Sequence, residues 1–276
     1  MTGLIIVGVD GSAPSTAAVE WAADDAIRMG ARLRLVHVLN RWPYDITDGD
    51  DYLAEAAGKV LAAAEVTART RQPDVEVSTR LIEGVPSAVL REQEQEATEL
   101  VVGSRGLGGF AGAVLGSVSM HLAGHAHCPV VVVRPGQQER HGEIVVGVDD
   151  SDACEAALGY AFEQAGLRGA TLRAIHAWQL PVHAFAPEIS YDLDQIRAAQ
   201  QEVATQRLAG WRAKYPEVPL IEDVRRAHPV DALTGVACDL IVVGSHGRGA
   251  IGSLLLGSVS RGVLHHARCA VAVVRP

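Results

Sequence analysis

The residues of this chain whose types suggest a chemical task form two glycine patterns with identical spacing. They consist of Gly103, Gly106 and Gly116-Ser117, and of Gly244, Gly247 and Gly257-Ser258. Glycine lacks a Cβ, so its backbone can take positive φ and approach an anion closely. A helix that begins at the Gly-Ser pair offers unpaired N–H groups and the positive end of its dipole to the same anion. The spacing therefore predicts a phosphate-binding loop followed by a phosphate-binding helix N-terminus, twice.

The duplication extends well beyond the glycines. Val102–Gly106 recurs 141 residues later as Val243–Gly247, and Arg134-Pro135 recurs at the same distance as Arg275-Pro276. Self-similarity of this kind predicts two copies of one domain. We place the first domain at residues 1–136 and the second at residues 142–276, with a polar junction between them.

Within each copy, short β-branched segments alternate with longer helical patterns, which is typical of a parallel sheet buried on both faces. In the first copy we expect strands at residues 4–10, 32–38, 76–81, 100–103 and 130–134, and helices at residues 15–29, 52–71, 87–96 and 117–125. The predicted fold class is α/β, with two tandem doubly wound, open, parallel five-stranded sheets. Such sheets bind ligands where the winding direction reverses, and the glycine patterns follow the fourth strand.

Both halves resemble universal stress protein domains of the ATP-binding type, whose pattern is G-2x-G-9x-G(S/T). The stretches Val7–Ser12 and Glu83–Pro86 also fit that family, and the resemblance covers essentially the whole chain, twice. It implies Rossmann-like sheets, ATP at the ends of the first and fourth strands, and pairing of domains through the strand that ends at Val133-Arg134. In a tandem chain this pairing can be internal, and a homodimer of the whole chain is a further expectation.

The resemblance assigns nucleotide contacts by position. Asp10 and Asp149 are expected beside the adenosine, the backbone at Val38 and Ala177 at the adenine edge, and residues 103–109 and 244–250 around the phosphates. In the first copy the expected set is Gly8, Asp10, Ser12, Val38, Gly103, Ser104, Arg105, Gly106, Leu107, Gly109, Gly116, Ser117, Val118 and Ser119. In the second copy it is Gly147, Asp149, Ser151, Ala177, Gly244, Ser245, His246, Gly247, Arg248, Gly257, Ser258, Val259 and Ser260. The hydroxyls of Ser117 and Ser119 are expected to help bind the phosphates.

The second copy departs from the pattern where Asp150 replaces Gly11, His246 replaces Arg105, and Ala227-His228 replaces Glu83-Gly84. An extra carboxylate repels a triphosphate unless a divalent cation intervenes, and a neutral histidine supplies less positive charge than arginine. We therefore expect two ATP sites, the first being tighter, with Mg²⁺ held mainly by the phosphates.

Composition excludes several classes of protein. The chain is 48% hydrophobic and 21% charged, which is typical of globular proteins, and its net charge of −9 argues against nucleic acid as a partner. Neither a signal-peptide pattern nor an apolar run of about 20 residues is present, so we expect a cytoplasmic protein without membrane spans. The cysteines lack CxxC spacing and are expected to be reduced and buried; they are Cys128, Cys154, Cys238 and Cys269.

Structural roles are open for several of these residues. The glycines can form simple turns, Asp10 and Asp149 can cap a turn or helix, and the histidines near residues 125 and 265 suit helix C-termini. The acidic cluster of Asp45, Asp48, Asp50 and Asp51 is assigned no chemistry.

The chain carries no GxSxG, HExxH or Walker A pattern, so we do not expect an enzyme. We interpret ATP as a ligand sensed by a nucleotide-dependent regulator that acts on an unidentified protein partner. A slow ATPase or nucleotidyl-transfer enzyme of related fold, and a scaffold with an empty site, are the alternatives.

Overall fold

The computed structural model describes residues 3–40, 50–107, 115–136, 140–180, 192–247 and 256–276. The first half contains β1 (Leu4–Gly8), α1 (Ala13–Met29), β2 (Arg32–Leu39), α2 (Asp50–Arg71), β3 (Val77–Glu83), α3 (Pro86–Glu92), the 3₁₀ turn η1 (Gln93–Glu96), β4 (Glu99–Gly103), α4 (Ser117–His125) and β5 (Val130–Val133). The second half contains β6 (Glu143–Gly147), α5 (Asp152–Arg168), β7 (Thr171–Trp178), α6 (Leu193–Lys214), β8 (Leu220–Arg226), α7 (Pro229–Thr234), β9 (Leu240–Gly244), α8 (Ser258–His266) and β10 (Ala270–Val274).

The predicted element order of the first half is confirmed, with boundaries that differ by one or two residues. The helix expected at residues 87–96 is the exception, because it changes to 3₁₀ geometry after Glu92. Local sequence signals fix α1 and α5 in the same way. Ser12 and Ser151 are their N-caps, and the helices end at Gly30 and Gly169, each with a φ of 59° in the left-handed region that favours glycine.

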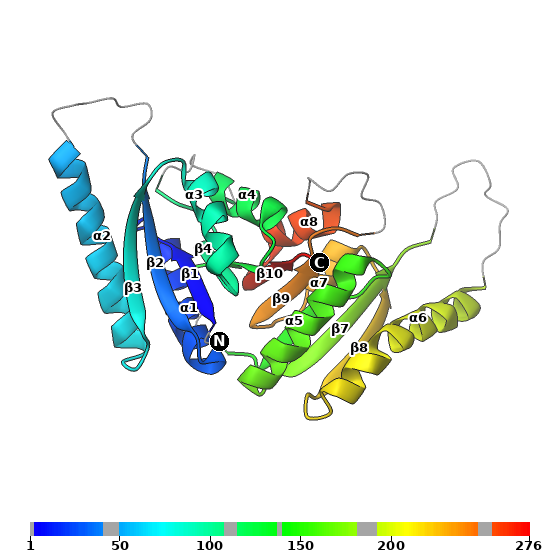
Figure 1. Cartoon of the computed structure of the whole chain (residues 1–276). Coiled ribbons are helices and arrows are strands. Elements are labelled where there is room, and N and C mark those ends of the chain that lie inside the picture. The colour runs from blue at the N-terminus through cyan, green and yellow to red at the C-terminus, as the bar shows by residue number, and fades with distance from the viewer. Residues whose placement is uncertain (1–2, 41–49, 108–114, 137–139, 181–191, 248–255) are drawn as a thin grey trace, which may run out of the picture.

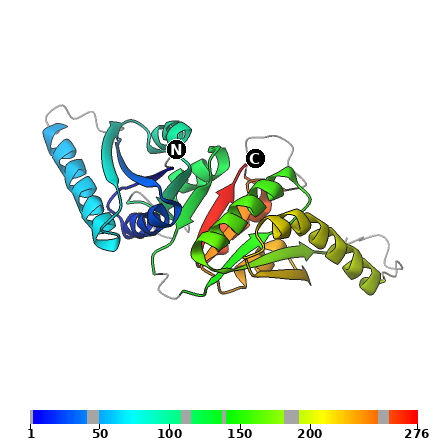
Figure 2. The same ribbon diagram turned by 60° about the horizontal axis from the view of Figure 1, so that its bottom comes forward.

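The strands form a single ten-stranded sheet with the order β3-β2-β1-β4-β5-β10-β9-β6-β7-β8. Strands within each half are parallel, which confirms the predicted fold class. Apolar side chains of α1, α2, α5 and α6 pack on one face of the sheet, and those of α3, α4, α7 and α8 pack on the other. Figures 1 and 2 show the two halves side by side, with α2 and α6 at opposite ends of the molecule.

The halves join where β5 and β10 pair antiparallel, with Val131 opposite Ala272. The contact is reciprocal at the helix ends, because Arg134 donates to the carbonyl of Leu264 in α8 and Arg275 donates to that of Gly124 in α4. The domain pairing expected through the strand at Val133-Arg134 therefore lies inside the chain.

An asymmetric polar cluster lies beneath this junction. Tyr160 of α5 donates a 2.6 Å hydrogen bond to Glu99 of β4, and Arg168 binds both carboxylate oxygens of Asp25 at 2.7 Å. Glu99 and Asp25 are fully buried. Burial raises the pKa of the Glu99 carboxyl to about 8, and the negative charge of Asp25 acts in the same direction. The contact of Glu99 with the opposite half has no counterpart in the other direction, because the second half has Leu240 at the position equivalent to Glu99.

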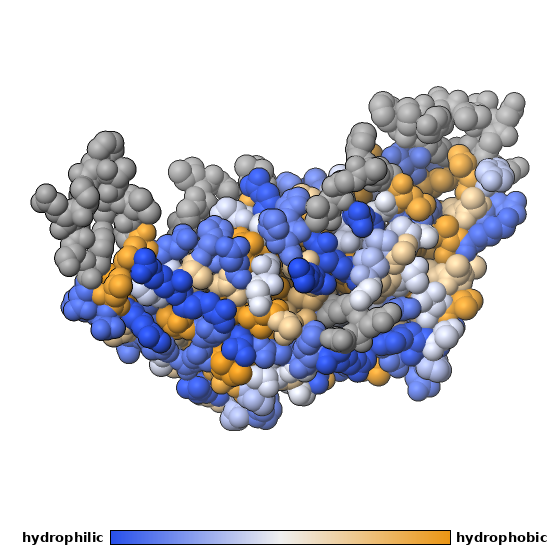
Figure 3. Space-filling model, turned by 180° about the vertical axis from the view of Figure 1, so that it is seen from behind, coloured by the Kyte–Doolittle hydropathy of each residue, from blue (hydrophilic) through white to orange (hydrophobic). Residues whose placement is uncertain are grey.

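No described helix is long and apolar enough to cross a membrane. On the face shown in Figure 3, hydrophilic residues predominate and apolar residues are scattered among them.

The buried Glu99 carboxyl predicts a pH-dependent stability. The unfolded carboxyl ionises near pH 4.3, whereas the folded one keeps its proton up to about pH 8, so the folded state binds more protons between these values. This group therefore makes the free energy of unfolding fall as pH rises through that window. As pH rises through this window, the free energy of unfolding of Glu99→Gln, measured in urea, should increase relative to wild type by up to about 1.4 kcal/mol per pH unit. Parallel pH profiles for the two proteins would show that Glu99 is ionised in the folded state.

Breaking the ion pair beneath the junction should destabilise the chain. Arg168→Met introduces the residue that the first half has at the equivalent position, Met29, and leaves buried Asp25 with only Arg28 at 2.6 Å among its described ion-pair partners. We expect the free energy of unfolding in urea to fall by about 3 kcal/mol, because a buried carboxylate loses the partner that binds both of its oxygens. Lys59→Met is the control, since its pair with Glu55 is exposed and should contribute less than about 1 kcal/mol. Equal losses in the two variants would contradict this account.

Candidate functional site

In each half, the candidate site lies where the winding of the sheet reverses. β1 pairs with both β2 and β4, and β6 pairs with both β7 and β9, so the carboxyl ends of β1, β4, β6 and β9 are the switch points. The glycine patterns begin at the last residues of β4 and β9. Gly116 and Gly257 are the N-caps of α4 and α8, as the spacing predicts.

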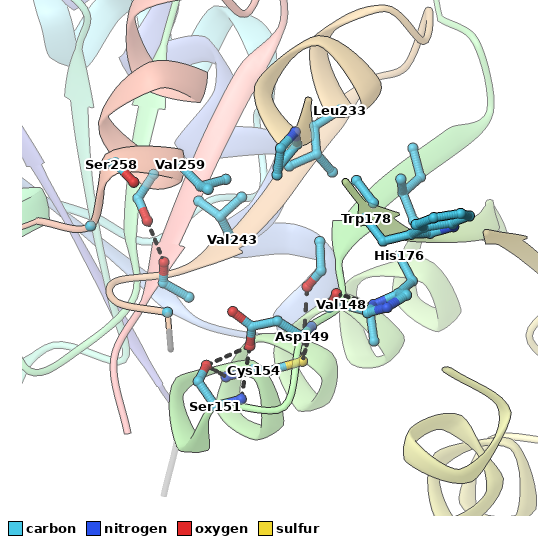
Figure 4. A pocket seen from close by; sticks show the side chains of 18 of the residues that line it. Val148, Asp149, Ser151, Cys154, His176, Trp178, Leu233, Val243, Ser258 and Val259 are labelled. Carbon is cyan, nitrogen blue, oxygen red and sulfur yellow. Dashed lines mark hydrogen bonds between the residues drawn. The ribbon is translucent and has the colours of Figure 1, made fainter. Parts of the chain in front are cut away.

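A cavity of about 760 Å³ occupies this position in the second half. Its walls come from the ends of β6, β7 and β9, from the first turns of α5 and α8, and from α6 and α7. In Figure 4, Ser258 and Val259 lie on one side, His176 and Trp178 on the other, and Asp149 with Ser151 between them. Predicted site residues that line the cavity are Gly147, Asp149, Ser151, Ala177, Gly244, His246, Gly247, Gly257, Ser258, Val259 and Ser260.

The remaining predicted residues have other placements. Gly109 and Arg248 lie outside the described residues, as do Asp45 and Asp48 of the acidic cluster. Ser104 and Ser245 are buried beneath the loop, whereas Leu107 is exposed. Val38 and Val118 are partly buried against the core of the first half.

Asp10 and Asp149 brace the same turn in the two halves. In the first half, Oδ1 of Asp10 accepts hydrogen bonds from the backbone N–H of Ser12 at 3.0 Å and from its hydroxyl at 2.6 Å. The corresponding distances from Ser151 to Asp149 are 2.9 and 2.6 Å. Oδ2 of Asp10 also accepts from the Leu107 N–H at 3.0 Å, so this carboxylate holds the glycine loop against the end of β1. The turn-forming role left open for these aspartates is therefore confirmed.

The glycines of the two patterns allow other parts of the chain to come close to their backbone. The positive φ expected for them is wrong, because none of the described pattern glycines has one. A Cβ on Gly103 would lie 2.6 Å from the carbonyl carbon of Pro14, and one on Gly244 would lie 2.9 Å from the carbonyl oxygen of Ala153. These positions let the starts of α1 and α5 pack against the fourth strand of each half.

The second glycine of each pattern makes room for a carboxylate. A Cβ on Gly106 would lie 2.3 Å from Oδ2 of Asp10, and one on Gly247 would lie 2.9 Å from Oδ2 of Asp149. Any side chain here would push the carboxylate or the loop out of position.

The role expected for the Ser119 hydroxyl needs correction. Ser119 is buried and donates to the carbonyl of Gly103 at 2.7 Å, and Ser260 donates to that of Gly244 at 2.6 Å. These hydroxyl protons brace the helix start against the strand end and do not point to an anion. Ser117 and Ser258, which open the helices, are exposed.

Several cavity residues escaped the sequence patterns. His176 contacts the carbonyl of Val148 through Nδ1 at 2.9 Å and Gln200 of α6 through Nε2 at 2.7 Å. Ile175, Trp178, Ile196 and Leu233 add an apolar wall. The β7 residues are sequence neighbours of the predicted Ala177, so their place in the site could have been predicted from it. No local sequence signal connects α6 with the glycine loop.

The cavity lining contains two buried polar atoms without partners. Among the described residues, Nε1 of Trp178 and Nε2 of His246 are buried side-chain nitrogens with no hydrogen bond. The other ring nitrogen of His246 lies 2.9 Å from the hydroxyl of Ser245. An unpaired buried polar atom costs about 1–3 kcal/mol, so these atoms favour a ligand that supplies partners.

Known proteins resemble this chain along nearly its whole length. A model of the universal stress protein family matches residues 1–134 and again residues 141–275. A universal stress protein of Mycobacterium tuberculosis is 36% identical and covers 98% of this chain and 96% of its own length.

One solved structure agrees with the fold, and a second is similar to about half of the chain. A universal stress protein from Archaeoglobus fulgidus has a TM-score of 0.74 at 20% identity and covers 99% of this chain and 96% of its own. A universal stress protein crystallised in complex with cAMP is 28% identical and covers 48% of this chain and 97% of its own, with a TM-score of 0.38. This chain belongs to the universal stress protein family, because the family model matches both halves and a relative matches it over nearly its full length.

Proposed function

We propose that the chain is an ATP-binding regulator of the stress response with one nucleotide site in each half. The observation that carries this proposal is the cavity of about 760 Å³ whose lining includes Gly247 and the first residues of α8. Its volume falls within the range of about 300–1,000 Å³ that is usual for small-molecule sites.

The two ends of the cavity suit the two ends of ATP. At one end, the first N–H groups of α8 have no partner within the helix and attract the phosphates, with Gly247 beside them. At the other end, Ile175, Trp178 and Leu233 offer apolar surface to the base. The unpartnered nitrogens of His246 and Trp178 are hydrogen-bonding groups that a nucleotide can satisfy.

The first half supports the same role by its matching geometry. Its Asp10–Ser12 turn repeats the contacts of Asp149 and Ser151 within 0.1 Å. We propose that this site is the tighter one, because Arg105 stands where the second half has His246 and Gly11 stands where it has Asp150. Among the described residues no group of three or more potential metal ligands is present, so Mg²⁺ would arrive with the phosphates.

Nucleotide occupancy would act through the glycine loops. In the first half the Leu107 N–H is bonded to Asp10, and a phosphate competing for this donor would change how the loop lies on the surface. We propose that a protein partner recognises the loop in its occupied state, and that the chain is not an enzyme.

Binding stoichiometry tests the proposal directly. Isothermal titration calorimetry of the full chain with Mg-ATP should give two ATP per chain with separable affinities. Titrations with cAMP and GTP in place of ATP define the nucleotide that is preferred. One ATP per chain would favour a half with an empty site. Absence of binding heat, together with no adenine nucleotide released on denaturing the purified protein, would refute the proposal.

Adding a methyl group to one loop glycine should weaken ATP binding in that half only. Gly106→Ala and Gly247→Ala place a Cβ 2.3 and 2.9 Å from the carboxylates of Asp10 and Asp149. We expect affinity at the altered site to fall at least about tenfold, which corresponds to about 1.4 kcal/mol, while the other site is unchanged.

Each loop variant has a matched control in the same half. Gly58→Ala and Gly210→Ala add the same methyl group at helix positions where nothing lies within 4 Å of the new Cβ. Both controls should retain two sites with wild-type affinity. If the loop variants bind ATP as tightly as these controls, the glycine loops do not hold the nucleotide.

A further inference from the structure

Two thiols touch in the second half, away from the nucleotide cavity. Cys238 lies between α7 and β9, and Cys269 lies between α8 and β10. Their Sγ atoms are 3.6 Å apart, and the residues are 3% and 6% exposed. All four cysteines of the chain are free, and Cys128 and Cys154 lie elsewhere. This pair has no role in the proposed nucleotide site.

The sheet topology brings these two residues together. β9 and β10 are parallel neighbours, and Leu240 pairs with Ala270 at their first residues. Segments that lead into adjacent parallel strands meet at the same rim of the sheet. Cys238 and Cys269 therefore lie at the rim opposite the glycine loops, which follow the carboxyl ends of the strands.

The pair is close to the geometry of a disulfide. A disulfide has an S–S length of about 2.05 Å, so the sulfurs need to approach by about 1.5 Å. Both cysteines precede their strands, so the shift that the sulfurs need falls outside β9 and β10. Ala237 and Arg268, which precede the two cysteines in the chain, are exposed. Each thiol thus directly follows an exposed residue in the chain, and local opening at this rim of the sheet would admit a small oxidant.

The surroundings distinguish the two sulfurs. The hydrogen bond between the two thiols lowers the pKa of Cys269 against the opposing effect of burial, and the Arg134 guanidinium from the first half lowers it as well. The same hydrogen bond and burial raise the pKa of Cys238. Because the thiolate is the nucleophile in cysteine oxidation, the positive charge of Arg134 favours Cys269 as the sulfur that attacks first.

We propose that Cys238 and Cys269 are a modification site: a dithiol that a peroxide oxidises to an intrachain disulfide. The Cys269 thiolate attacks one peroxide oxygen and breaks the O–O bond, giving a sulfenic acid and a hydroxide that takes up a proton. Cys238 then attacks the sulfenic sulfur, and its proton leaves with the displaced hydroxide as water. With hydrogen peroxide, two thiols lose two electrons and two protons, and two waters form.

The first half contains a built-in comparison. Cys128 occupies the position equivalent to Cys269, but Ala97 stands where the second half has Cys238. Burial raises the pKa of the Cys128 thiol to about 12, and no second cysteine is present to resolve a sulfenic acid there. Oxidation to a disulfide is therefore specific to the second half, where it would tie β9, which leads to the glycine loop, to β10, which joins the halves.

Thiol counting on the full chain tests the proposal. Reduced protein, freed of reductant and treated with hydrogen peroxide, should fall from four titratable thiols to two after unfolding. Its mass should drop by two hydrogens, and a peptide that links Cys238 to Cys269 should appear under non-reducing digestion. Dithiothreitol should restore all four thiols.

Two variants make the assignment specific. Cys238→Ala installs the residue found at position 97 and should abolish the disulfide, leaving a sulfenic acid at Cys269 that dimedone traps. Cys128→Ala is the control and should still lose two thiols with the same linked peptide. Four thiols remaining after peroxide, or linkage through Cys128 or Cys154, would overturn the proposal.

Discussion

The antiparallel ladder between β5 and β10 is the contact on which the architecture depends. Each half alone would present a strand of four or five valine and alanine residues at the sheet edge. Pairing these strands with each other removes both edges and makes one sheet with β3 and β8 as its outer strands. It also lets Arg134 and Arg275 bind the ends of helices in the opposite half. An edge used in this way inside one chain is not available for pairing with a second copy.

The halves are similar in backbone and unequal in chemistry. Both place an Asp-Ser turn, a glycine loop and a helix start around the same switch point, so one local geometry is built twice. The polar cluster under the junction has no such symmetry, because Glu99 meets Tyr160 in one direction and Leu240 occupies the equivalent position in the other. Each half is therefore specified as the partner of the other, while the two candidate sites differ in charge.

The sequence predicted the elements and the switch-point location from periodicity, repeats and glycine spacing, and the family resemblance added part of the second-half cavity lining. It did not predict the structural reason for Gly103 and Gly106. The backbone of Pro14 and the carboxylate of Asp10 come close to these glycines only in the folded chain. For the same reason Ser119 was assigned to an anion when its proton is used by Gly103. The Gln200 contact and the thiol pair depend on long-range packing, which no local pattern encodes.

We expect an adenine nucleotide at both switch points, with its phosphates beside a glycine loop and a helix start. A crystal structure of the full chain grown with Mg-ATP tests this most directly. We predict triphosphate density beside Gly106 and Ser117 and beside Gly247 and Ser258, with the base against β2 and β7. Nucleotide bound at another surface, or clear density for both loops with no nucleotide in either, would contradict the account.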